Sequence, residues 1–319
     1  MMFLKAGDIV DIVFPATCCS NEEIMAIKNY LQNKIGLTPR ILLENIVTPT
    51  IKENIGNCFP SYDITPRFEQ LYQALNNSQS KIVWCAKGGY GSGDLLPLLE
   101  KAQKLKQNKL FIGFSDITSI ALFIQQKWNW KTITAPMLLQ LAKNSIEQKA
   151  QDQLKALIFG EKTELSYNLT PLNSGFENKP IEAEITGGCL SVLAGHFGGS
   201  YQIDFADKIL FLEDQAEEGE KLDRYFRQII EIILKTGKAP KAIILGNFMN
   251  KSSSITPDEQ NVRIAFQRMA QKIEQFNLKI PLLEETEKSL GHSSNMRPLI
   301  LGTSTEISFD KYIKLQQIL

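Results

Sequence analysis

Residues Lys109–Ile124 read KLFIGFSDITSIALFI, and this stretch decides the fold of the first half of the chain. The run Lys109–Ile112 predicts a buried strand, and Ile120 and Ile124 belong to a helical pattern that follows a turn. KIVWC (Lys81–Cys85) is a second such strand, again followed by a glycine-containing turn and a helical pattern. Strands that alternate with helices predict a parallel sheet with helices on both faces.

The alternation extends over residues 8–160. Asp8–Phe14 is apolar and β-branched, which predicts a strand. Ser20 with Glu23 three residues later forms a capping-box pattern and predicts the start of a helix.

The length of the chain predicts two domains, because 319 residues exceed what a single hydrophobic core usually supports. We expect an N-terminal α/β domain over residues 1–160, which contains Ser115. Residues 161–180 are rich in Asn, Ser, Pro and Gly, which is typical of a linker. Residues 181–319 mix strands and helices and predict a second domain of the α+β class.

Composition excludes several classes of function. Lys plus Arg and Asp plus Glu both number 35, so no net positive charge favours nucleic acid or an anionic membrane. Asp8 and Asp11 interrupt the apolar N-terminal run, and no later run approaches about 18 residues, so we expect a cytoplasmic protein. Five cysteines without a CxxC pair, and only two histidines, argue against a disulfide framework or a zinc site. We expect no metal.

The glycine-rich stretch Lys87–Asp94, KGGYGSGD, follows a predicted strand. It does not match GxGxxG, because Asp94 stands three residues after Gly91, and GxxxxGK[ST] is absent. Two interpretations remain: a tight turn without a ligand, or backbone N–H groups offered to a ligand at the carboxyl end of a strand. The density of glycine around Tyr90 favours the second.

Ser115 stands between a strand and a helix, and two interpretations fit it. A serine on such a turn can expose its Oγ beside the backbone N–H of the next residue, as in a nucleophile elbow. Alternatively, Ser115 or Asp116 is only a helix N-cap, which is the commoner reason for either residue at this position.

A serine nucleophile needs a base and an acid. His196 lies among apolar residues and His292 in a polar loop, so His292 is the better candidate base. Glu213 ends the predicted strand KILFLE and is the candidate acid. Most of the acidic residues after it are interpreted as a solvated face or as favourable charge at a helix N-terminus: Asp214, Glu217, Glu218 and Glu220. The order Ser, Glu, His also occurs in α/β-hydrolases, although GFSDI lacks the second glycine of GxSxG.

Several motifs occur together in the order seen in the LD-carboxypeptidases, the serine peptidases that include the microcin-immunity peptidases. They are GDIVDIVFPAT, VWCAKGGYGSGDLLPLL, FIGFSDIT, AEITGGCLSVLAG, ILFLEDQAEE with LDR, and GHSSN. The sequence resembles this family over residues 7–302, nearly the whole chain.

The resemblance implies Ser115 as nucleophile, Glu213 as acid and His292 as base. It implies an α/β N-terminal domain, a C-terminal domain with a β-barrel-like sheet, a homodimer, and no cofactor. The implied reaction releases the terminal D-alanine of the murein tetrapeptide during cell-wall recycling. Our candidates for the oxyanion hole are the backbone N–H groups of Asp116 and of Gly88 or Gly89. The sequence departs from the family at Cys189, where asparagine is usual, and at Thr134, where a His-Gly-Pro is common.

Other functions stay open. A microcin-immunity-type peptidase would cleave an acyl or peptidyl adenylate with the same triad and needs an aromatic clamp for adenine. Trp84, Trp128 and Trp130 are candidates for that clamp, although Trp84 lies in a predicted strand. A noncatalytic small-ligand-binding protein of the same fold is a third possibility, and a generic esterase is disfavoured by the missing GxSxG. Arg224 and Arg297 are candidates to hold the terminal carboxylate of the substrate.

Overall fold

A computed structural model describes residues 3–42, 63–103, 108–248 and 259–318. The chain divides into two compact units, Met1–Lys162 and Thr163–Leu319.

The first unit is built on a parallel sheet. Its strands are β1 (Ile9–Val13), β2 (Thr38–Arg40), β3 (Ile82–Cys85), β4 (Leu110–Ile112) and β5 (Thr132–Thr134). They lie in the order β5-β4-β3-β1-β2, and every pairing is parallel. Strands β3, β4 and β5 are buried throughout, which matches the continuous apolar runs of the sequence. The predicted α/β class of this unit is confirmed.

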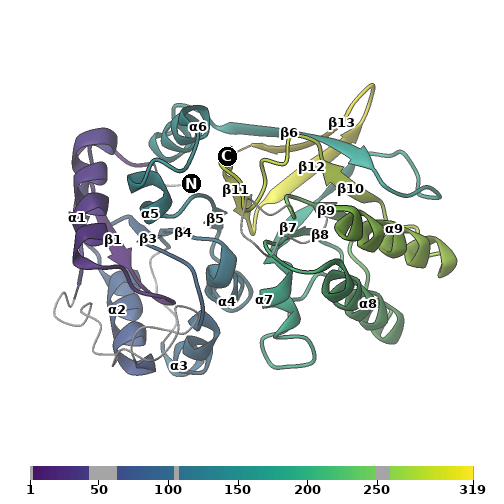
Figure 1. Ribbon diagram of the computed structural model, residues 1–319, viewed down its shortest axis with the longest axis horizontal. Helices are drawn as coiled ribbons and strands as arrows, with labels where there is room; N and C mark the ends of the chain where they lie inside the picture. The colour runs from purple at the N-terminus through teal and green to yellow at the C-terminus, as the bar shows by residue number, and fades with distance from the viewer. Residues whose placement is uncertain (1–2, 43–62, 104–107, 249–258, 319) are drawn as a thin grey trace. The chain divides into compact units, whose positions relative to one another are not determined.

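Helices flank this sheet on both sides. They are α1 (Asn21–Tyr30), η1 (Leu31–Ile35), α2 (Ile64–Asn76), η3 (Ser92–Leu95), α3 (Leu96–Lys101), η4 (Ser115–Ile117), α4 (Thr118–Trp128), α5 (Leu138–Ala142) and α6 (Gln148–Phe159). In Figure 1, α5 and α6 lie above the strands and α2 and α3 below them. The capping box is confirmed: Ser20 Oγ accepts from the Glu23 N–H at 3.2 Å, and Glu23 Oε2 accepts from the Ser20 N–H at 3.1 Å.

The second unit contains a closed barrel-like sheet in the order β10-β6-β13-β12-β7-β8-β9. Its strands and helices are β6 (Glu164–Pro171), β7 (Ile181–Cys189), α7 (Leu190–Ala194), β8 (Ile209–Glu213), α8 (Gly219–Thr236), β9 (Ala242–Leu245), α9 (Glu259–Gln275), β10 (Leu282–Glu285), β11 (Leu299–Leu301), β12 (Ser304–Phe309) and β13 (Ile313–Ile318). Strands β7, β8, β9 and β10 are parallel neighbours, and α8 and α9 lie side by side in Figure 1. This confirms the β-barrel-like sheet that the resemblance implied.

Strand β6 falls inside the range 161–180 that composition assigned to a linker. Residues 164–171 pair with β10 and β13 in the barrel. Leu165, Tyr167 and Leu169 are buried and alternate with more exposed polar residues, which is the pattern of a half-buried strand. The frequent Asn, Ser and Pro residues obscured this alternation.

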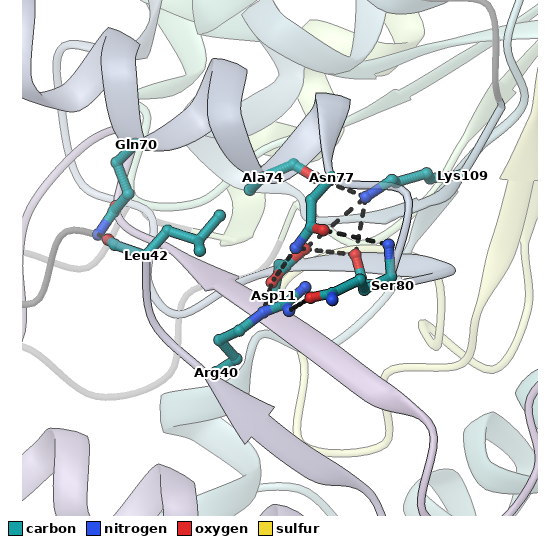
Figure 2. Close-up of polar contacts among 9 residues, drawn as sticks. Asp11, Arg40, Leu42, Gln70, Ala74, Asn77, Ser80 and Lys109 are labelled. Atoms are coloured by element: carbon teal, nitrogen blue, oxygen red, sulfur yellow. Dashed lines mark hydrogen bonds and ion pairs between the residues drawn. The ribbon is translucent and has the colours of Figure 1, made fainter.

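A buried polar cluster ties together the amino-terminal side of the first sheet (Figure 2). Asp11 of β1 is 1% exposed, and its carboxylate forms an ion pair with Arg40 at 2.7 Å. Asn77 and Ser80 also donate to this carboxylate. Lys109 donates to Ser80 Oγ at 2.7 Å and to the Ala74 carbonyl at 2.6 Å. Burial lowers the pKa of Lys109 to about 8, although the Asp11 carboxylate opposes this shift.

No helix in the described ranges is both long and apolar enough to cross a membrane.

Because Lys109 is buried and paired, we expect Lys109→Met to destabilise the protein. The substitution leaves the Ala74 carbonyl and Ser80 without their donor, so the free energy of unfolding should fall by about 3 kcal/mol. Lys131→Met is the matched control, because Lys131 also directly precedes a strand but is exposed, and its effect should stay within about 0.5 kcal/mol. Urea unfolding measures both, and equal losses would contradict a special role for the cluster.

Candidate active site

Ser115 occupies a strained turn just after β4. Its φ angle is 61°, a left-handed conformation that is uncommon for serine. The turn begins the short helix η4 and leads directly into α4. A strained serine between a strand and a helix, at the carboxyl edge of a parallel sheet, has the geometry of a nucleophile elbow.

Glycines let the neighbouring backbone approach Ser115. A Cβ at Gly113 would lie 2.6 Å from Ile117 Cγ2, so no side chain fits there. A Cβ at Gly88 would lie 3.3 Å from the Cβ of Ser115 and 3.4 Å from its Oγ, which places Gly88 beside this serine. Gly89 has φ 116°, and a Cβ there would overlap Thr17 Oγ1 at 2.1 Å. The glycine-rich stretch therefore passes next to Ser115, as the oxyanion-hole hypothesis requires.

The side chains of Ser115 and Asp116 do not cap the helix. Neither η4 nor α4 has a side-chain hydrogen bond at its N-cap, and the N-cap positions are Phe114 and Ile117. Asp116 is instead buried, and its Oδ2 accepts from the Ser92 N–H at 2.8 Å. Burial raises the pKa of the Asp116 carboxyl, and hydrogen bonds from Ser92 oppose the shift. The N-cap interpretation is therefore wrong for both residues.

Glu213 and His292 meet in the second unit. Glu213 ends β8 and is fully buried, and His292 lies in the loop after β10. His292 Nδ1 lies 2.6 Å from Glu213 Oε2, and the same oxygen accepts from the His292 backbone N–H at 3.2 Å. A carboxylate can only accept, so Nδ1 carries the proton and Nε2 of the neutral ring is the proton acceptor. Burial lowers the pKa of His292, but the Glu213 carboxylate outweighs burial and raises it above 6.5.

The loop of His292 is held against the ends of β8 and β9. Gly291 has φ 105°, and a Cβ there would lie 2.5 Å from Glu213 Oε2. Asn247 follows β9, and its side chain donates to the His292 carbonyl while its N–H donates to Leu290 O at 2.6 Å. Buried Glu285 accepts from the Ser289 N–H at 2.6 Å and closes the base of the loop. These contacts fix the imidazole in one orientation.

Asp214 differs from what the sequence pattern indicates for the acidic residues after Glu213. The sequence pattern indicates a solvated face or helix N-terminal charge for most of the acidic run, but Asp214 is only 3% exposed. Its carboxylate accepts from the Ser191 N–H at 2.7 Å and from the Cys189 thiol at 3.4 Å. Burial and the neighbouring Glu213 carboxylate raise the pKa of Asp214 to about 6. Cys189, which departs from the family pattern, therefore belongs to a buried hydrogen-bonded group beside the acid.

Other residues singled out by sequence have structural surroundings. Trp84, Trp128 and Trp130 are all buried, and Trp84 Nε1 donates to the Pro136 carbonyl at 3.0 Å. The guanidinium of Arg297 lies 4.4 Å from the centre of the Tyr167 ring and donates to the Ser166 carbonyl at 2.8 Å. His196 is half-buried with its ring nearly perpendicular to that of Tyr201, Arg224 is exposed on α8, and Thr134 is buried at the end of β5.

The two units, one with a parallel α/β sheet and one with a closed barrel-like sheet, each match a domain of one family of peptidases. The profile of the LD-carboxypeptidase N-terminal domain matches residues 10–135, and that of the C-terminal domain matches residues 182–307. The chain is 31% identical to "Putative carboxypeptidase RP402" of Rickettsia prowazekii over 255 residues, which cover 79% of this chain and 75% of that protein. The chain belongs to the LD-carboxypeptidase family.

Two further proteins bear on the function. The murein tetrapeptide carboxypeptidase of Pseudomonas aeruginosa is 31% identical over 193 residues, which cover 58% of this chain and 61% of that protein. The microcin C7 self-immunity protein MccF, solved as a variant with adenosine monophosphate, shares the fold with a TM-score of 0.76. Its sequence identity is 18%, and the match covers 99% of this chain and 97% of that chain.

The Glu213–His292 pair predicts a measurable titration. We expect His292 to accept a proton only in its neutral form, so kcat/KM should rise with pH through a pKa above 6.5. Glu213→Gln removes the carboxylate that stabilises the imidazolium, so the pKa of His292 should fall. Proton NMR can follow this directly, because the chain has only two histidines. His196 serves as the internal control and should titrate as before; an unchanged His292 titration would contradict the pairing.

Proposed function

We propose that the chain is a serine carboxypeptidase that hydrolyses an L,D-amide bond and releases the terminal D-alanine of the murein tetrapeptide. Ser115 is the nucleophile, His292 the base and Glu213 the acid. The observation that carries this proposal is the 2.6 Å contact between His292 Nδ1 and the buried Glu213 carboxylate. Such a pair orients an imidazole and stabilises its protonated form during acyl transfer.

The strained turn supports the role of Ser115. A left-handed serine is costly to maintain, and such strain is concentrated at functional sites. The buried Asp116 carboxylate and the close approach of Gly88 fix the backbone on either side of the hydroxyl. This arrangement suits backbone N–H groups that receive a developing negative charge, and we assign that role to Asp116 and to Gly88 or Gly89.

The proposed reaction proceeds in two acyl-transfer steps. His292 Nε2 takes the proton of Ser115 Oγ while the oxygen attacks the amide carbonyl, and the oxyanion is held by the backbone N–H groups. The intermediate then expels D-alanine, whose nitrogen receives the proton from His292. Water next loses a proton to His292 and attacks the ester carbonyl. Ser115 leaves with that proton, and the shortened peptide is released as its carboxylate.

The choice of substrate rests on two observations. A relative 31% identical to this chain is named a murein tetrapeptide carboxypeptidase. In addition, the three tryptophans considered for an adenine clamp are buried in the first unit, so none of them is available to stack on a nucleotide. Cleavage of an aminoacyl or peptidyl adenylate is therefore the alternative to the carboxypeptidase reaction. Only the similarity of the fold to MccF supports it.

The nucleophile can be tested with UDP-MurNAc-tetrapeptide and a measurement of free D-alanine. Ser115→Ala removes the attacking oxygen, so kcat should fall by at least about a thousandfold. Ser145→Ala is the control, because Ser145 is an exposed serine of the same unit whose Oγ donates to the Gln140 carbonyl, and it should keep full activity.

The same assay tests the reaction. If the unmodified protein releases no D-alanine but consumes an aminoacyl adenylate, the carboxypeptidase proposal fails and the alternative stands. If Ser115→Ala retains the activity of the unmodified protein on either substrate, the proposed mechanism fails.

A further inference from the structure

Arg67 of α2 is a buried cation that the reaction as described does not use. The residue is 2% exposed, which is rare for arginine. Its Nη1 donates to the Pro15 carbonyl at 2.9 Å and to the Gly91 carbonyl at 2.7 Å. Its Nη2 lies 3.2 Å from Asp94 Oδ2, and the Asp94 side chain is half exposed. Most of its hydrogen bonds therefore go to backbone carbonyls.

These carbonyls belong to the loops that follow β1 and β3. The two loops also contact each other directly, because the Thr17 N–H of the first loop donates to the Gly88 carbonyl of the second at 3.3 Å. Thr17 also fills the space that a side chain at Gly89 would need. One guanidinium thus joins two loops that contact each other through Thr17 and Gly88, and Gly88 lies beside Ser115.

The third loop, which carries Ser115, is attached through Ser92. This residue directly follows Gly91, whose carbonyl Arg67 holds. The Ser92 N–H donates to Asp116 Oδ2 at 2.8 Å, and Ser92 Oγ donates to the Asp116 carbonyl at 2.5 Å. A continuous chain of hydrogen bonds therefore runs from Arg67 to the residue after the nucleophile.

The arrangement is costly if packing is its only purpose. Arg67 Nε is buried and has no hydrogen-bond partner among the described residues. Burying a guanidinium with an unpaired N–H reduces stability, and an apolar side chain of similar volume is often as stable or more so. The planar group, however, can hold two carbonyls and a carboxylate at fixed relative positions, which an apolar side chain cannot do.

We propose that Arg67 is a positioning residue that fixes the loops after β1, β3 and β4, and thereby the backbone N–H groups of Gly88, Gly89 and Asp116 around Ser115. This inference rests on the proposed function. Displacement of these groups by about 1 Å is expected to lower kcat on the order of a hundredfold, because the donors must meet the oxyanion of the transition state. KM should change by less than about threefold, because Arg67 does not reach the substrate.

The test compares Arg67→Ala, Arg67→Lys and Arg40→Ala in D-alanine release from UDP-MurNAc-tetrapeptide, with circular dichroism to confirm folding. We expect the alanine variant to lose kcat, the lysine variant to retain part of it, and added guanidinium, but not ammonium at equal ionic strength, to restore kcat of the alanine variant. Arg40→Ala is the matched control. It breaks the ion pair with buried Asp11 in the same unit, so it should lower the melting temperature and leave kcat unchanged.

Labelling of Ser115 by a fluorophosphonate gives a readout that does not depend on the peptide substrate, and it should slow in parallel with kcat. If Arg67→Ala does not fold, Arg67→Lys decides the question. Folded Arg67 variants with the kcat and labelling rate of the unmodified protein would overturn this inference while leaving the proposed function intact. An unmodified protein that neither releases D-alanine nor reacts at Ser115 would overturn both.

Discussion

The candidate site depends on one constraint. At the carboxyl ends of parallel strands, the backbone of a glycine must pass close to another residue. In the first unit, Gly88 and Gly113 leave no room for a Cβ without contact to Ser115 or Ile117. In the second unit, Gly291 does the same against Glu213. The missing side chains let the backbone pass close to these groups, and Gly291 also has a φ of 105°, which other residues adopt only with strain. Both halves of the proposed catalytic apparatus are therefore built by the same device.

In the second unit, two adjacent carboxyl groups, those of Glu213 and Asp214, are buried. Burial and the neighbouring Glu213 carboxylate raise the pKa of Asp214 to about 6. Both carboxyl groups are almost completely enclosed, and burying such polar groups costs free energy. Two features offset this cost. The His292 ring and backbone N–H both donate to Glu213, and the Ser191 N–H and Cys189 thiol donate to Asp214. Cys189 at a position where the family usually has asparagine keeps a donor toward this pair, although a thiol is a weaker one.

Periodicity and motif order predicted much of this arrangement. The strand–turn–helix pattern around Ser115 and the parallel sheet followed from apolar runs, because buried parallel strands have such runs. His292 could be selected because the chain offers only two histidines. The barrel class came from the resemblance, and strand β6 escaped prediction because turn-forming residues obscured the alternation of Leu165, Tyr167 and Leu169.

Residues that act through tertiary contacts could not be predicted in this way. Asp214 lies at the start of an acidic run, and neighbours of like charge are usually solvated, so nothing local distinguished it. Arg67 stands in an amphipathic helix where a polar residue is usually exposed. Its role depends on carbonyls of residues 15 and 91, which are distant in sequence and come together only when β1 and β3 pair. No spacing rule connects them.

Cationic side chains lie near both ends of the strands in the first unit, and their partners differ between the two ends. On the amino-terminal side, buried Lys109 and the partly exposed Arg40 lie near the buried Asp11 carboxylate, so positive charge is neutralised where no ligand is expected. On the carboxyl-terminal side, Arg67 holds mainly backbone carbonyls and its carboxylate partner is half exposed. Its charge is thus less fully compensated within the protein, on the side of the sheet where α/β proteins bind ligands. Under our proposal this cation orders the loops around Ser115, and its charge also favours the ionised form of Asp116, the residue that follows Ser115.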